Sequence, residues 1–590
     1  MGRWSALHVH LHGGSEQTET VLREHIVPIT SGLLARGEIS SWFFVRYWEG
    51  GPHLRWRVAD ATPETVRRMR DGLVEAVAAL APPARELRPA DWYARFGVRD
   101  AGSTGPAPRG HGDGGGPDLG WQPHGTVREQ PYRAEVDRYG GPEAIGAAEE
   151  LFAASSRVAA ALLAAPPARR RSTTVDLLFG FLTASGLAAH EAVRFLRGYA
   201  NAWTLVPEAD GQDLGLALIA AHRDFHADAS AYPARRRLIA DIVTRRKGAG
   251  TTVNYWADEV AAYVERLRTL EGQGRLHGTV PGILASQLHM LHNRLGLSIP
   301  AECHLAWLAS SAYATPAGPP DFHADGLDAP DREYHERSKF VRPLWPSQRP
   351  RTVEAAPARP GPADPPGTGL LALPEPTPGA LGDTTLARAL LDRRTRYDVG
   401  REQLDVADLG RLLRYAAGDT APPGGEQRRL AYPSPGALVT TRLMVLPRRV
   451  TSVPAALYEY LPRRHALRRL TPDPGADRLA RIAPQFTPAG SARTVGEPDA
   501  ALASDGLDVE AVPLWLFVVA ELGRARARYG LRGYRFCAIE TGHLAQNLLL
   551  AATALGCSAA PLGGFFDDEL NHLLLLDGLD SSAFYALTLG

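Results

Sequence analysis

Alternating polar and apolar residues characterise the first predicted strands of the chain. In the segment HLRWRV, which follows a Gly-Gly-Pro turn, His53, Arg55 and Arg57 alternate with apolar residues. Side chains of a strand point to opposite faces in turn, so one face of this strand carries an imidazole and two guanidinium groups. The preceding run WFFVRYW is also rich in strand-forming residues. The two runs are therefore predicted to form a hairpin.

Helical periodicity prevails in the segments that follow. Before the middle of the chain it predicts helices at 142–163, 174–200, 255–270 and 283–297. The second part is predicted to contain helices at 384–394, 404–418, 543–556 and 567–576 and strands at 443–447, 513–520 and 584–590. The helix at 543–556 is apolar nearly all round, which indicates burial, and Gly556 is expected to end it. Because both parts mix strands and helices, we predict an α+β fold for each.

Proline and glycine content predicts where the chain divides. Residues 346–379 are rich in proline and lack apolar periodicity, so we interpret them as a semi-rigid linker. The expected domains are therefore 1–345 and 380–590. A low-complexity stretch at 102–120 is expected to be a mobile surface loop.

Charge and cysteine content exclude several classes of protein. The 590 residues include 65 basic Lys and Arg and 65 acidic Asp and Glu, so the net charge of zero argues against a general nucleic-acid binder. The three cysteines are far apart, which argues against a disulfide framework or a thiolate zinc site. No secretion signal begins the sequence, and no run of roughly 18 apolar residues predicts a membrane span. We therefore expect a cytoplasmic protein without membrane association.

Three groups of polar residues in the first part could carry chemistry. Arg55 and Arg57 lie about 7 Å apart along a strand and could each bind a different pair of anion oxygens, although a solvated strand face has the same pattern. Arg138 precedes a Gly-Gly turn and could instead form a salt bridge with Glu135 or Asp137.

The third group, His289, His292 and Asn293, shares one face of a predicted helix. The HxxH spacing could suit a metal ion, but the sequence offers no third ligand nearby, so no metal site is expected. Isolated core or surface histidines are the alternative interpretation.

The second part lacks the glycine-rich phosphate-binding motifs GxGxxG and Walker A. Its candidate segments are a helix end rich in arginine, a Pro-Ser-Pro-Gly turn and a Gly-Gly pair before a predicted helix. Each could also be an ordinary surface patch, turn or loop. The residues concerned are Arg393, Arg394 and Arg396, then Ser434 and Gly436, then Gly563 and Gly564.

Residues 1–345 resemble the C-terminal domain of class I lantibiotic dehydratases, on the motifs FFVRYWEGGPHLRWRV, EVDRYGG and SQLHMLHNRLG. The resemblance implies an elimination domain. A partner enzyme uses glutamyl-tRNA to glutamylate Ser or Thr of a precursor peptide, and this domain expels glutamate to leave dehydroalanine or dehydrobutyrine. The family's functional positions correspond to Arg55, Arg57, Arg138 and His289.

The chemistry suits these residue types. The Cα–H beside an amide is a weak acid, and fixed positive charge at the developing enolate lowers the barrier to its removal. An imidazole such as that of His289 can move a proton near neutral pH. The same family includes pyridine synthases that join two dehydroalanines in a formal [4+2] cycloaddition, and a non-catalytic peptide-binding module is a further alternative.

Residues 380–590 resemble flavin-dependent azoline dehydrogenases of the nitroreductase superfamily, the SagB or McbC type, most closely in RYGLRGYRF, ETGHLAQN and PLGGFFDDELN. The resemblance implies non-covalent FMN at a homodimer interface and oxidation of thiazolines or oxazolines to azoles. By position it implies cofactor contacts from Arg393, Arg394, Thr395, Ser434, Gly436, Gly563 and Gly564. Arg528 and Tyr529 replace a Lys-Tyr pair. Because arginine stays protonated near neutral pH, Tyr529 is the better candidate to accept a proton.

The whole chain resembles the bifunctional eliminase–dehydrogenase fusions of lactazole-like thiopeptide pathways. This resemblance implies a ribosomal precursor peptide, glutamylated and azoline-containing, as substrate. It also implies two partner enzymes of the same pathway, one that glutamylates the peptide and a cyclodehydratase that forms the azolines.

Overall fold

The computed structural model divides the chain into two compact units, Met1–Pro319 and Pro320–Gly590. It describes residues 4–83, 85, 87–93, 120–205, 214–245, 251–317, 321–326, 328–352, 370–377, 381, 384–421, 429–482 and 507–590. The expected loop at 102–120 lies outside the described residues except for its last residue, and so does most of the expected linker at 346–379. Mixed helices and strands in each unit confirm the α+β prediction.

The first unit begins with a four-stranded antiparallel sheet of order β2-β3-β1-β4. Its strands are β1 (Trp4–His10), β2 (Ser41–Tyr47), β3 (His53–Ala59) and β4 (Val127–Pro131). The predicted hairpin is β2 and β3, which pair from Ser41 opposite Ala59 to Tyr47 opposite His53. Gly50 and Gly51 both have positive φ in the connecting turn, at 77° and 98°, a conformation that glycine adopts without steric cost.

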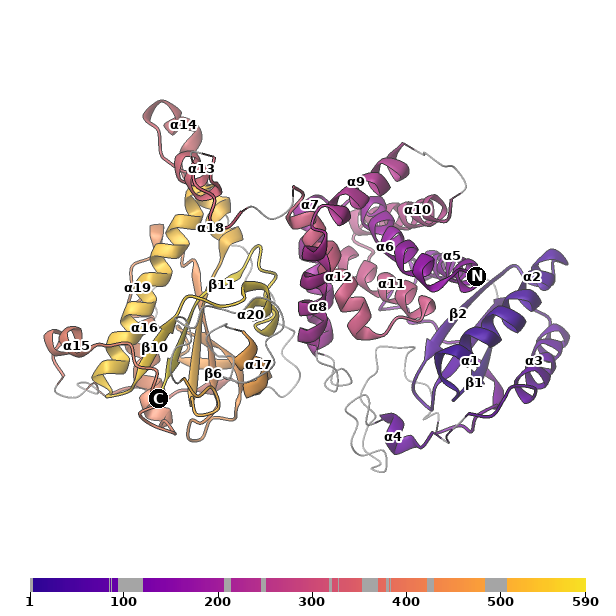
Figure 1. Cartoon of the computed structure of the whole chain (residues 1–590), viewed down its shortest axis with the longest axis horizontal. Coiled ribbons are helices and arrows are strands. Elements are labelled where there is room, and N and C mark those ends of the chain that lie inside the picture. The colour runs from indigo at the N-terminus through magenta and orange to yellow at the C-terminus, as the bar shows by residue number, and fades with distance from the viewer. Residues whose placement is uncertain are drawn as a thin grey trace. The chain divides into compact units, whose positions relative to one another are not determined.

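One face of this sheet packs on the first helices of the chain, as Figure 1 shows. These are α1 (Gly14–Val21), the π-helical turn η1 (Leu22–Ile26), α2 (Val27–Ala35) and α3 (Pro63–Ala78). Leu54, Trp56 and Val58, the apolar positions of β3, join a buried cluster with Met69 and Leu73 of α3. The alternation predicted from HLRWRV is therefore confirmed on its apolar side.

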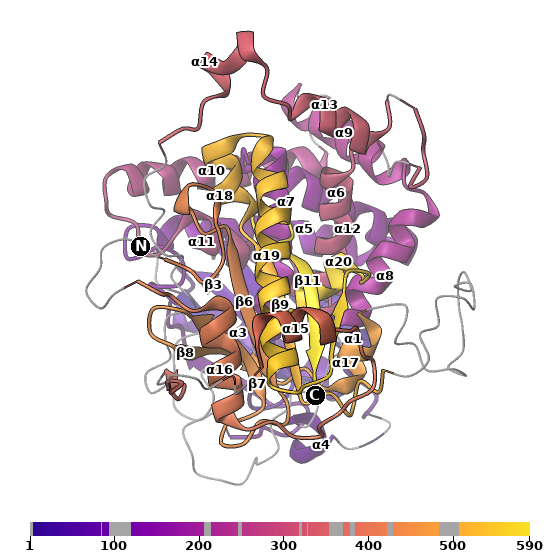
Figure 2. The ribbon, with the colours of Figure 1, turned by 90° about the vertical axis from the view of Figure 1, so that its left-hand side faces the viewer.

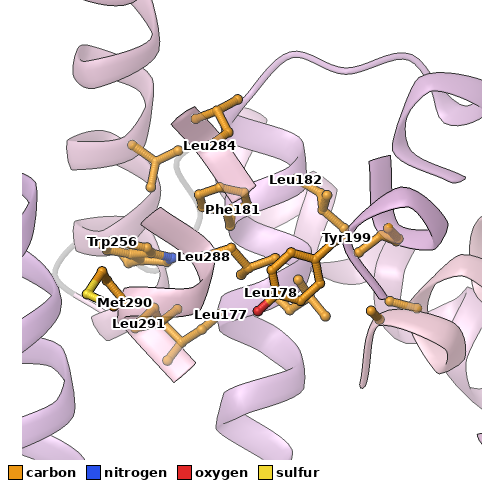
Figure 3. Close-up of a cluster of buried hydrophobic side chains, with 14 of the residues drawn as sticks. Leu177, Leu178, Phe181, Leu182, Tyr199, Trp256, Leu284, Leu288, Met290 and Leu291 are labelled. Carbon is orange, nitrogen blue, oxygen red and sulfur yellow. The ribbon is translucent and has the colours of Figure 1, made fainter. Parts of the chain in front are cut away.

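Helices form the rest of the first unit. They are α4 (Pro89–Tyr93), α5 (Ile145–Leu163), α6 (Pro167–Ala184), α7 (Ala189–Ala202), α8 (Leu214–Ala227), α9 (Ala231–Thr244), α10 (Thr252–Gly272), α11 (Val280–Leu295) and α12 (Ile299–Ala314), with the short turn η3 (Trp203–Leu205). The single helix predicted at 174–200 is wrong, because Gly186 with φ of 67° separates α6 from α7. Figure 3 shows Phe181, Trp256 and Leu288 within the buried core between these helices.

Helix α11 is fixed to the edge strand β2 by one side chain. The Asn293 amide donates to the carbonyl of Arg46 at 2.8 Å, and its oxygen accepts from the Arg46 amide at 2.9 Å. Further along β2, the Phe44 amide donates to Ser156 of α5 at 3.1 Å. Helix side chains thus occupy backbone groups that an edge strand would otherwise leave open to another strand.

The second unit contains a seven-stranded sheet of order β10-β11-β9-β6-β7-β8-β5. Its strands are β5 (Leu371–Ala372), β6 (Thr441–Pro447), β7 (Ala456–Leu461), β8 (Ala466–Pro472), β9 (Leu514–Ala520), β10 (Ala559–Leu562) and β11 (Ser582–Leu589). The continuous apolar run of β9 is buried on both faces: Leu514, Leu516 and Val518 join one core cluster, and Trp515 and Phe517 join the other. Such a run is typical of a central strand covered on both sides.

The helices of this unit cover both faces of the sheet. They are α13 (Pro330–Arg337), α14 (Trp345–Gln348), α15 (Leu386–Asp392), α16 (Val406–Ala417), α17 (Ala476–Arg481), α18 (Leu522–Tyr529), α19 (Arg532–Ala554) and α20 (Asp567–Leu573), with short turns η5 (Arg342–Leu344) and η6 (Pro435–Ala437). Helix α13 lies within the range expected for the first domain but belongs to the second unit. Figure 2 shows α19 crossing one face of the sheet in front of β9 and β11.

Helix α19 begins earlier than the sequence predicted and ends as predicted. Gly556 has φ of 69°, and the Cys557 amide donates to the Ala552 carbonyl at 2.9 Å. A left-handed glycine with this hydrogen bond is a common helix stop.

Among the described residues, no helix is long and apolar enough to cross a membrane.

Replacing Asn293 with alanine should loosen the attachment of α11 to β2. The variant loses both hydrogen bonds to the Arg46 backbone and leaves a partly buried N–H and C=O without them, so it should be destabilised by roughly 1–3 kcal/mol. Hydrogen–deuterium exchange of the β2 amides should rise in this variant. Gln273→Ala, at an exposed position after α10, is the matched control. Unchanged β2 exchange in Asn293→Ala would contradict the role given to this contact.

Candidate functional site

The polar face of β3 lies inside the first unit. All seven residues of β3 are buried, and Arg55 and Arg57 are only 5% and 4% exposed. The alternative of a solvated strand face is therefore wrong. Across the sheet, His8 of β1 lies opposite Arg55, and His10 lies opposite His53. This polar face thus combines guanidinium and imidazole groups.

Aromatic rings and an imidazole hold the two arginines. The Arg55 guanidinium lies 3.3 Å from the centre of the Tyr47 ring, and its Nε donates to Nε2 of His53 at 3.1 Å. The Arg57 guanidinium lies 5.1 Å from the Phe43 ring and 4.8 Å from the Tyr132 ring. Desolvated cation–π contacts of this kind offset part of the free energy lost when a charge leaves water.

Histidines of β1 and β3 form a stacked row beside these arginines. The His53 ring lies 5.1 Å from His8 and 4.5 Å from His10, with interplanar angles of 28° and 29°. At the end of β1, His12 is 5.8 Å from His124. Sequence analysis did not select this row, although the alternation in LHVHLH was a visible signal.

Burial keeps the row neutral near pH 7. Burial, together with Arg55 and Arg57, lowers the pKa of His8 to about 2. Burial and the neighbouring His12 lower the pKa of His10 to about 4, and burial holds the pKa of His53 well below its usual value. Neutral imidazoles add no positive charge next to the buried guanidinium groups. Among the described residues, Nδ1 of His8 and Nδ1 of His10 have no hydrogen-bond partner, so either atom could bind a ligand.

Arg138 lies against the helix that carries His289. Its Nε donates to Ser286 of α11 at 3.3 Å, and its guanidinium pairs with Glu135 at 3.1 Å. The salt bridge with Glu135 that we considered from sequence is confirmed, while Asp137 lies 3.3 Å from His277 instead.

His289 is paired with a carboxylate that the sequence did not reveal. Nδ1 of His289 lies 3.1 Å from Glu302 of α12, and Nδ1 of His292 lies 3.5 Å from the same carboxylate. Tyr199 also donates to Glu302, and the His289 ring packs edge-on against Trp203 with centroids 4.9 Å apart. Glu302 is fully buried. It lies in another helix from His289, and no local motif marks it.

Electrostatics favour a charged Glu302. Burial alone raises the pKa of this carboxyl group, but His289 and His292 outweigh burial and lower its pKa to about 2. Burial and Glu302 together raise the pKa of Tyr199 well above its usual value, so Tyr199 remains a donor. A carboxylate that binds Nδ1 of a histidine fixes the ring and leaves Nε2 for proton exchange. In the described part of the chain, no group of three or more His, Cys, Asp or Glu side chains could hold a metal ion.

The structure places the four predicted residues of the first unit on adjoining elements. Arg55 and Arg57 share β3, and Arg138 contacts the helix of His289. These two sets meet where Asn293, one turn after His289, binds the backbone of Arg46 in β2. The neighbours of Arg46 in β2 are paired with the strand of Arg55.

In the second unit, the predicted turn and Tyr529 come together. The Tyr529 hydroxyl donates to the Pro435 carbonyl at 3.0 Å. Gly436 has φ of 56°, and a Cβ at this position would collide with the Tyr529 hydroxyl, so only glycine fits. Arg528 approaches the same position, 3.4 Å from that Cβ. Ser434, Gly436, Arg528 and Tyr529 therefore form one group.

A buried carboxylate fixes this turn. Glu540 of α19 accepts from Ser434 at 2.9 Å and from the Thr440 hydroxyl and amide at 2.7 and 3.0 Å. Thr441 also donates to it, at 3.0 Å. The Ser434 hydroxyl in turn accepts from the Val439 amide at 2.8 Å. Glu540 belongs to the ETGHLAQN segment that carried the resemblance, but its structural role was not evident from sequence.

The other predicted cofactor contacts lie elsewhere in the unit. Arg394 donates to the carbonyls of Leu391 and Arg393, both at 2.8 Å, and so caps helix α15. The Arg396 amide donates to Ala559, just beyond the C-terminal end of α19. Tyr529 lies just before the N-terminal end of this helix, whose 23 residues span about 35 Å. The segment containing Arg393, Arg394 and Thr395 is thus near the opposite end of α19 from Tyr529.

The loop after β10 carries the two predicted glycines. Gly563 and Gly564 are exposed, and a Cβ at Gly563 would lie 3.5 Å from the Tyr585 ring. A planar ring could approach this open backbone closely.

The group around Tyr529 fits a flavin. Nε of Arg528 is buried and has no hydrogen-bond partner among the described residues, so it can donate to an electron-rich ring edge. Gly436 removes a side chain at the same place. Donors and open backbone of this kind suit the polar edge of an isoalloxazine.

Acid should destabilise the sheet of the first unit. Below pH of about 6.5, histidines of the unfolded chain bind protons that the buried row excludes. The contribution of His10 to the free energy of unfolding should therefore fall as the pH drops from about 6.5 to its folded pKa of about 4. His10→Gln, which stays neutral, should reduce this pH dependence by roughly 1–3 kcal/mol. Hydrogen–deuterium exchange of the β1 and β3 amides at several pH values measures it.

His277→Gln is the control for this measurement, because the His277 side chain is 54% exposed. It should keep the pH dependence of the unchanged protein. If His10→Gln keeps that dependence as well, His10 is not excluded from protonation as the geometry requires.

Comparisons with known proteins agree with both resemblances. Residues 4–313 match the family described as lantibiotic biosynthesis dehydratase C-term, and residues 390–590 match the nitroreductase family. The protein MJ1384 of Methanocaldococcus jannaschii, named for the nitroreductases, is 29% identical over 189 residues, which cover 32% of this chain and 83% of that protein.

Two solved structures are also similar. A nitroreductase-type protein from Anabaena variabilis has 24% identity and a TM-score of 0.31, over 44% of this chain and 45% of that one, so the chain spans less than half of its length. The pyridine synthase TbtD from thiomuracin biosynthesis has 20% identity and a TM-score of 0.41, over 53% of this chain and 98% of that one. On the match over residues 4–313, the chain belongs to the lantibiotic biosynthesis dehydratase C-term family, and it carries a nitroreductase-family domain after that region.

Proposed function

We propose that this chain is an enzyme that modifies one ribosomally made precursor peptide at two separate sites. The first unit eliminates glutamate from glutamylated Ser or Thr to give dehydroalanine or dehydrobutyrine. The second unit, with FMN bound, oxidises azolines to azoles. The observation that carries the proposal is the buried polar face of Arg55 and Arg57, on the sheet that helix α11 with His289 is fixed to.

Elimination can be written with the groups of the first unit. The Cα–H bond breaks, its electron pair forms the Cα=Cβ bond, and the Cβ–O bond to glutamate breaks, so that glutamate leaves as a carboxylate. Guanidinium groups of Arg55 and Arg57 in a desolvated site stabilise the negative charge that develops on the peptide. His289 accepts the Cα proton at Nε2, and Glu302 stabilises the resulting imidazolium.

Arg138 and the histidine row complete this assignment. Arg138 lies beside α11 and can bind a carboxylate of the glutamyl group. Nδ1 of His8 and Nδ1 of His10 can hydrogen bond the ester or the peptide without adding charge. A neutral row favours elimination because it leaves the guanidinium groups as the source of positive charge at the enolate.

For the second unit, bound FMN would supply the acceptor for the hydride that leaves the azoline ring. Tyr529 is assigned to the proton that leaves the adjacent carbon, because its hydroxyl is held at 3.0 Å from the Pro435 carbonyl. Arg528 would donate to the ring edge, and Gly436, Gly563 and Gly564 would let the ring approach the backbone. Arg393, Arg394 and Thr395 would contact the phosphate and ribityl chain.

A homodimer follows from the separation of these cofactor contacts. The arginine-rich segment and Tyr529 lie near opposite ends of α19, so one FMN reaching both sets needs residues from two copies. Helix α15 supports this assembly, because Leu386, Leu390 and Leu391 are 68%, 53% and 70% exposed. Apolar side chains clustered on one short helix are typical of an association surface.

Two further enzymes must act on the peptide before this chain does. Elimination consumes a glutamyl ester, so a glutamylating enzyme has to form that ester. Oxidation consumes an azoline, so a cyclodehydratase has to close the ring. Both are proposed partners in the same pathway.

Single substitutions should separate the two reactions on a glutamylated, azoline-bearing peptide. Arg57→Ala and His289→Ala should slow glutamate loss by roughly 10²- to 10³-fold and leave the loss of two hydrogens unchanged. Tyr529→Phe should do the reverse. Mass spectrometry of the product follows both changes in one sample.

His277→Ala, at an exposed site of the first unit, is the matched control and should keep both reactions. Glutamate loss that persists in both Arg57→Ala and His289→Ala would reject the elimination proposal and favour a peptide-binding module. A macrocycle with release of the leader peptide, in place of free glutamate, would instead identify a pyridine synthase.

Leu390→Glu should disrupt the proposed dimer. A carboxylate on this face would have to be desolvated in the interface, which costs several kcal/mol, so the variant should sediment as a monomer and lose visible flavin absorption. Leu238→Glu is a matched control, since Leu238 is 47% exposed on α9 of the first unit. A variant that stays dimeric with full flavin content would contradict the α15 interface.

A further inference from the structure

The segment between the two family domains packs on the proposed redox site. Residues 330–351 lie after the match that ends at 313 and before the match that begins at 390. They form α13, η5 and α14. Helix α13 packs where α18 ends and α19 begins, and Figure 1 shows it beside α18. This corner immediately follows Tyr529.

Two hydrogen bonds from the segment hold the backbone on both sides of Tyr529. The Tyr334 hydroxyl donates to the Leu531 carbonyl at 2.8 Å. The Arg351 amide donates to the Arg528 carbonyl, also at 2.8 Å. The last carbonyls of a helix lack partners within that helix, and α18 ends at Tyr529. The segment therefore provides donors that the end of α18 would otherwise lack.

Side chains of α19 bind the segment in return. Arg535 donates to the His335 carbonyl at 2.5 Å, and Arg532 donates to the Ser338 carbonyl at 3.4 Å. Both carbonyls lie at the C-terminal end of α13, where a positive charge is favourable for the helix dipole. The contact is thus reciprocal, with each helix end capped by the other partner.

Aromatic and cation–π contacts fill the interface. The Tyr334 and Tyr534 rings meet edge to face with centroids 5.6 Å apart, and the Arg535 guanidinium lies 5.8 Å from the Tyr334 ring. The Arg532 guanidinium lies 5.3 Å from the Phe340 ring. Contacts of each kind are worth about 0.5–1 kcal/mol, so together they can hold the segment in place.

The corner that the segment covers needs such support. Gly530 has φ of 57° and ψ of −140°, a conformation essentially limited to glycine, and the helical hydrogen-bonding pattern breaks there. On the other side of the corner, Tyr529 reaches Pro435 and Gly436. A shift of the corner would therefore move the Tyr529 hydroxyl relative to the turn that it contacts.

We infer that residues 330–351 are a positioning segment of the redox site, which holds Tyr529 at the turn containing Gly436. The inference rests on the proposed dehydrogenase function and extends it to residues that neither family match contains. It places the redox unit's requirement for intact structure well before residue 390. Tyr334 acts through the Leu531 backbone and touches no reacting group.

Variants of Tyr334 in the full chain test the inference. Tyr334→Phe removes only the hydroxyl donor, and Tyr334→Ala also removes the ring. Hydrogen–deuterium exchange of amides 528–535 should rise in both, more in Tyr334→Ala. The kcat of azoline oxidation per bound flavin should fall by about 10- to 100-fold, while KM for the peptide and the rate of glutamate loss stay unchanged. Arg337→Ala is the control, because Arg337 forms an exposed pair with Glu333 in the same helix.

Three results would overturn the inference. One is exchange and kcat in both Tyr334 variants equal to those of Arg337→Ala. Another is a fall in flavin content with kcat per bound flavin unchanged, which indicates a merely structural role. If the unchanged protein oxidises no azoline, the proposed function fails. In that case exchange of amides 528–535 and the visible spectrum of bound flavin still decide the positioning role, and no change in either would be the third result against it.

Discussion

Burial of guanidinium groups is the constraint on which the first unit depends. Arg55 and Arg57 lie on a strand without an exposed residue, and moving such charges out of water costs several kcal/mol per ion unless local contacts compensate. The Tyr47 ring, Nε2 of His53 and a row of neutral histidines supply that compensation. The same dry environment strengthens the interaction of these groups with any negative charge that forms beside them. Stability and the proposed chemistry therefore depend on the same contacts.

Each unit also uses one buried carboxylate to fix a candidate residue. Glu302 binds His289, His292 and Tyr199 in the first unit, and Glu540 binds the Ser434 turn and two threonines in the second. Both carboxylates have several donors, so the cost of their desolvation is offset and their neighbours have little freedom to move. Preorganised groups of this kind are what proton transfer and cofactor binding require. The two sites thus reach the same physical solution on different folds.

Two proposed sites on one chain act on the same peptide, which raises the effective concentration of one site for the product of the other. The chain that joins the family domains is part of this arrangement, because residues 330–351 pack on the corner next to Tyr529. The connection between the domains is therefore also a structural part of the redox unit.

The sequence by itself determined the hairpin with Arg55 and Arg57 on one face, the end of α19 at Gly556 and the membership of both families. These features are local, because they depend on strand and helix periodicity and on the conformational freedom of glycine. Only the tertiary structure decided that the polar face of β3 is buried, that Glu302 binds His289 and that Tyr334 caps the corner after Tyr529. The Ser434–Glu540 and Tyr334–Leu531 contacts join residues 106 and 197 positions apart. No local pattern encodes such pairs, because they form only when separate elements pack together and exclude water from between them.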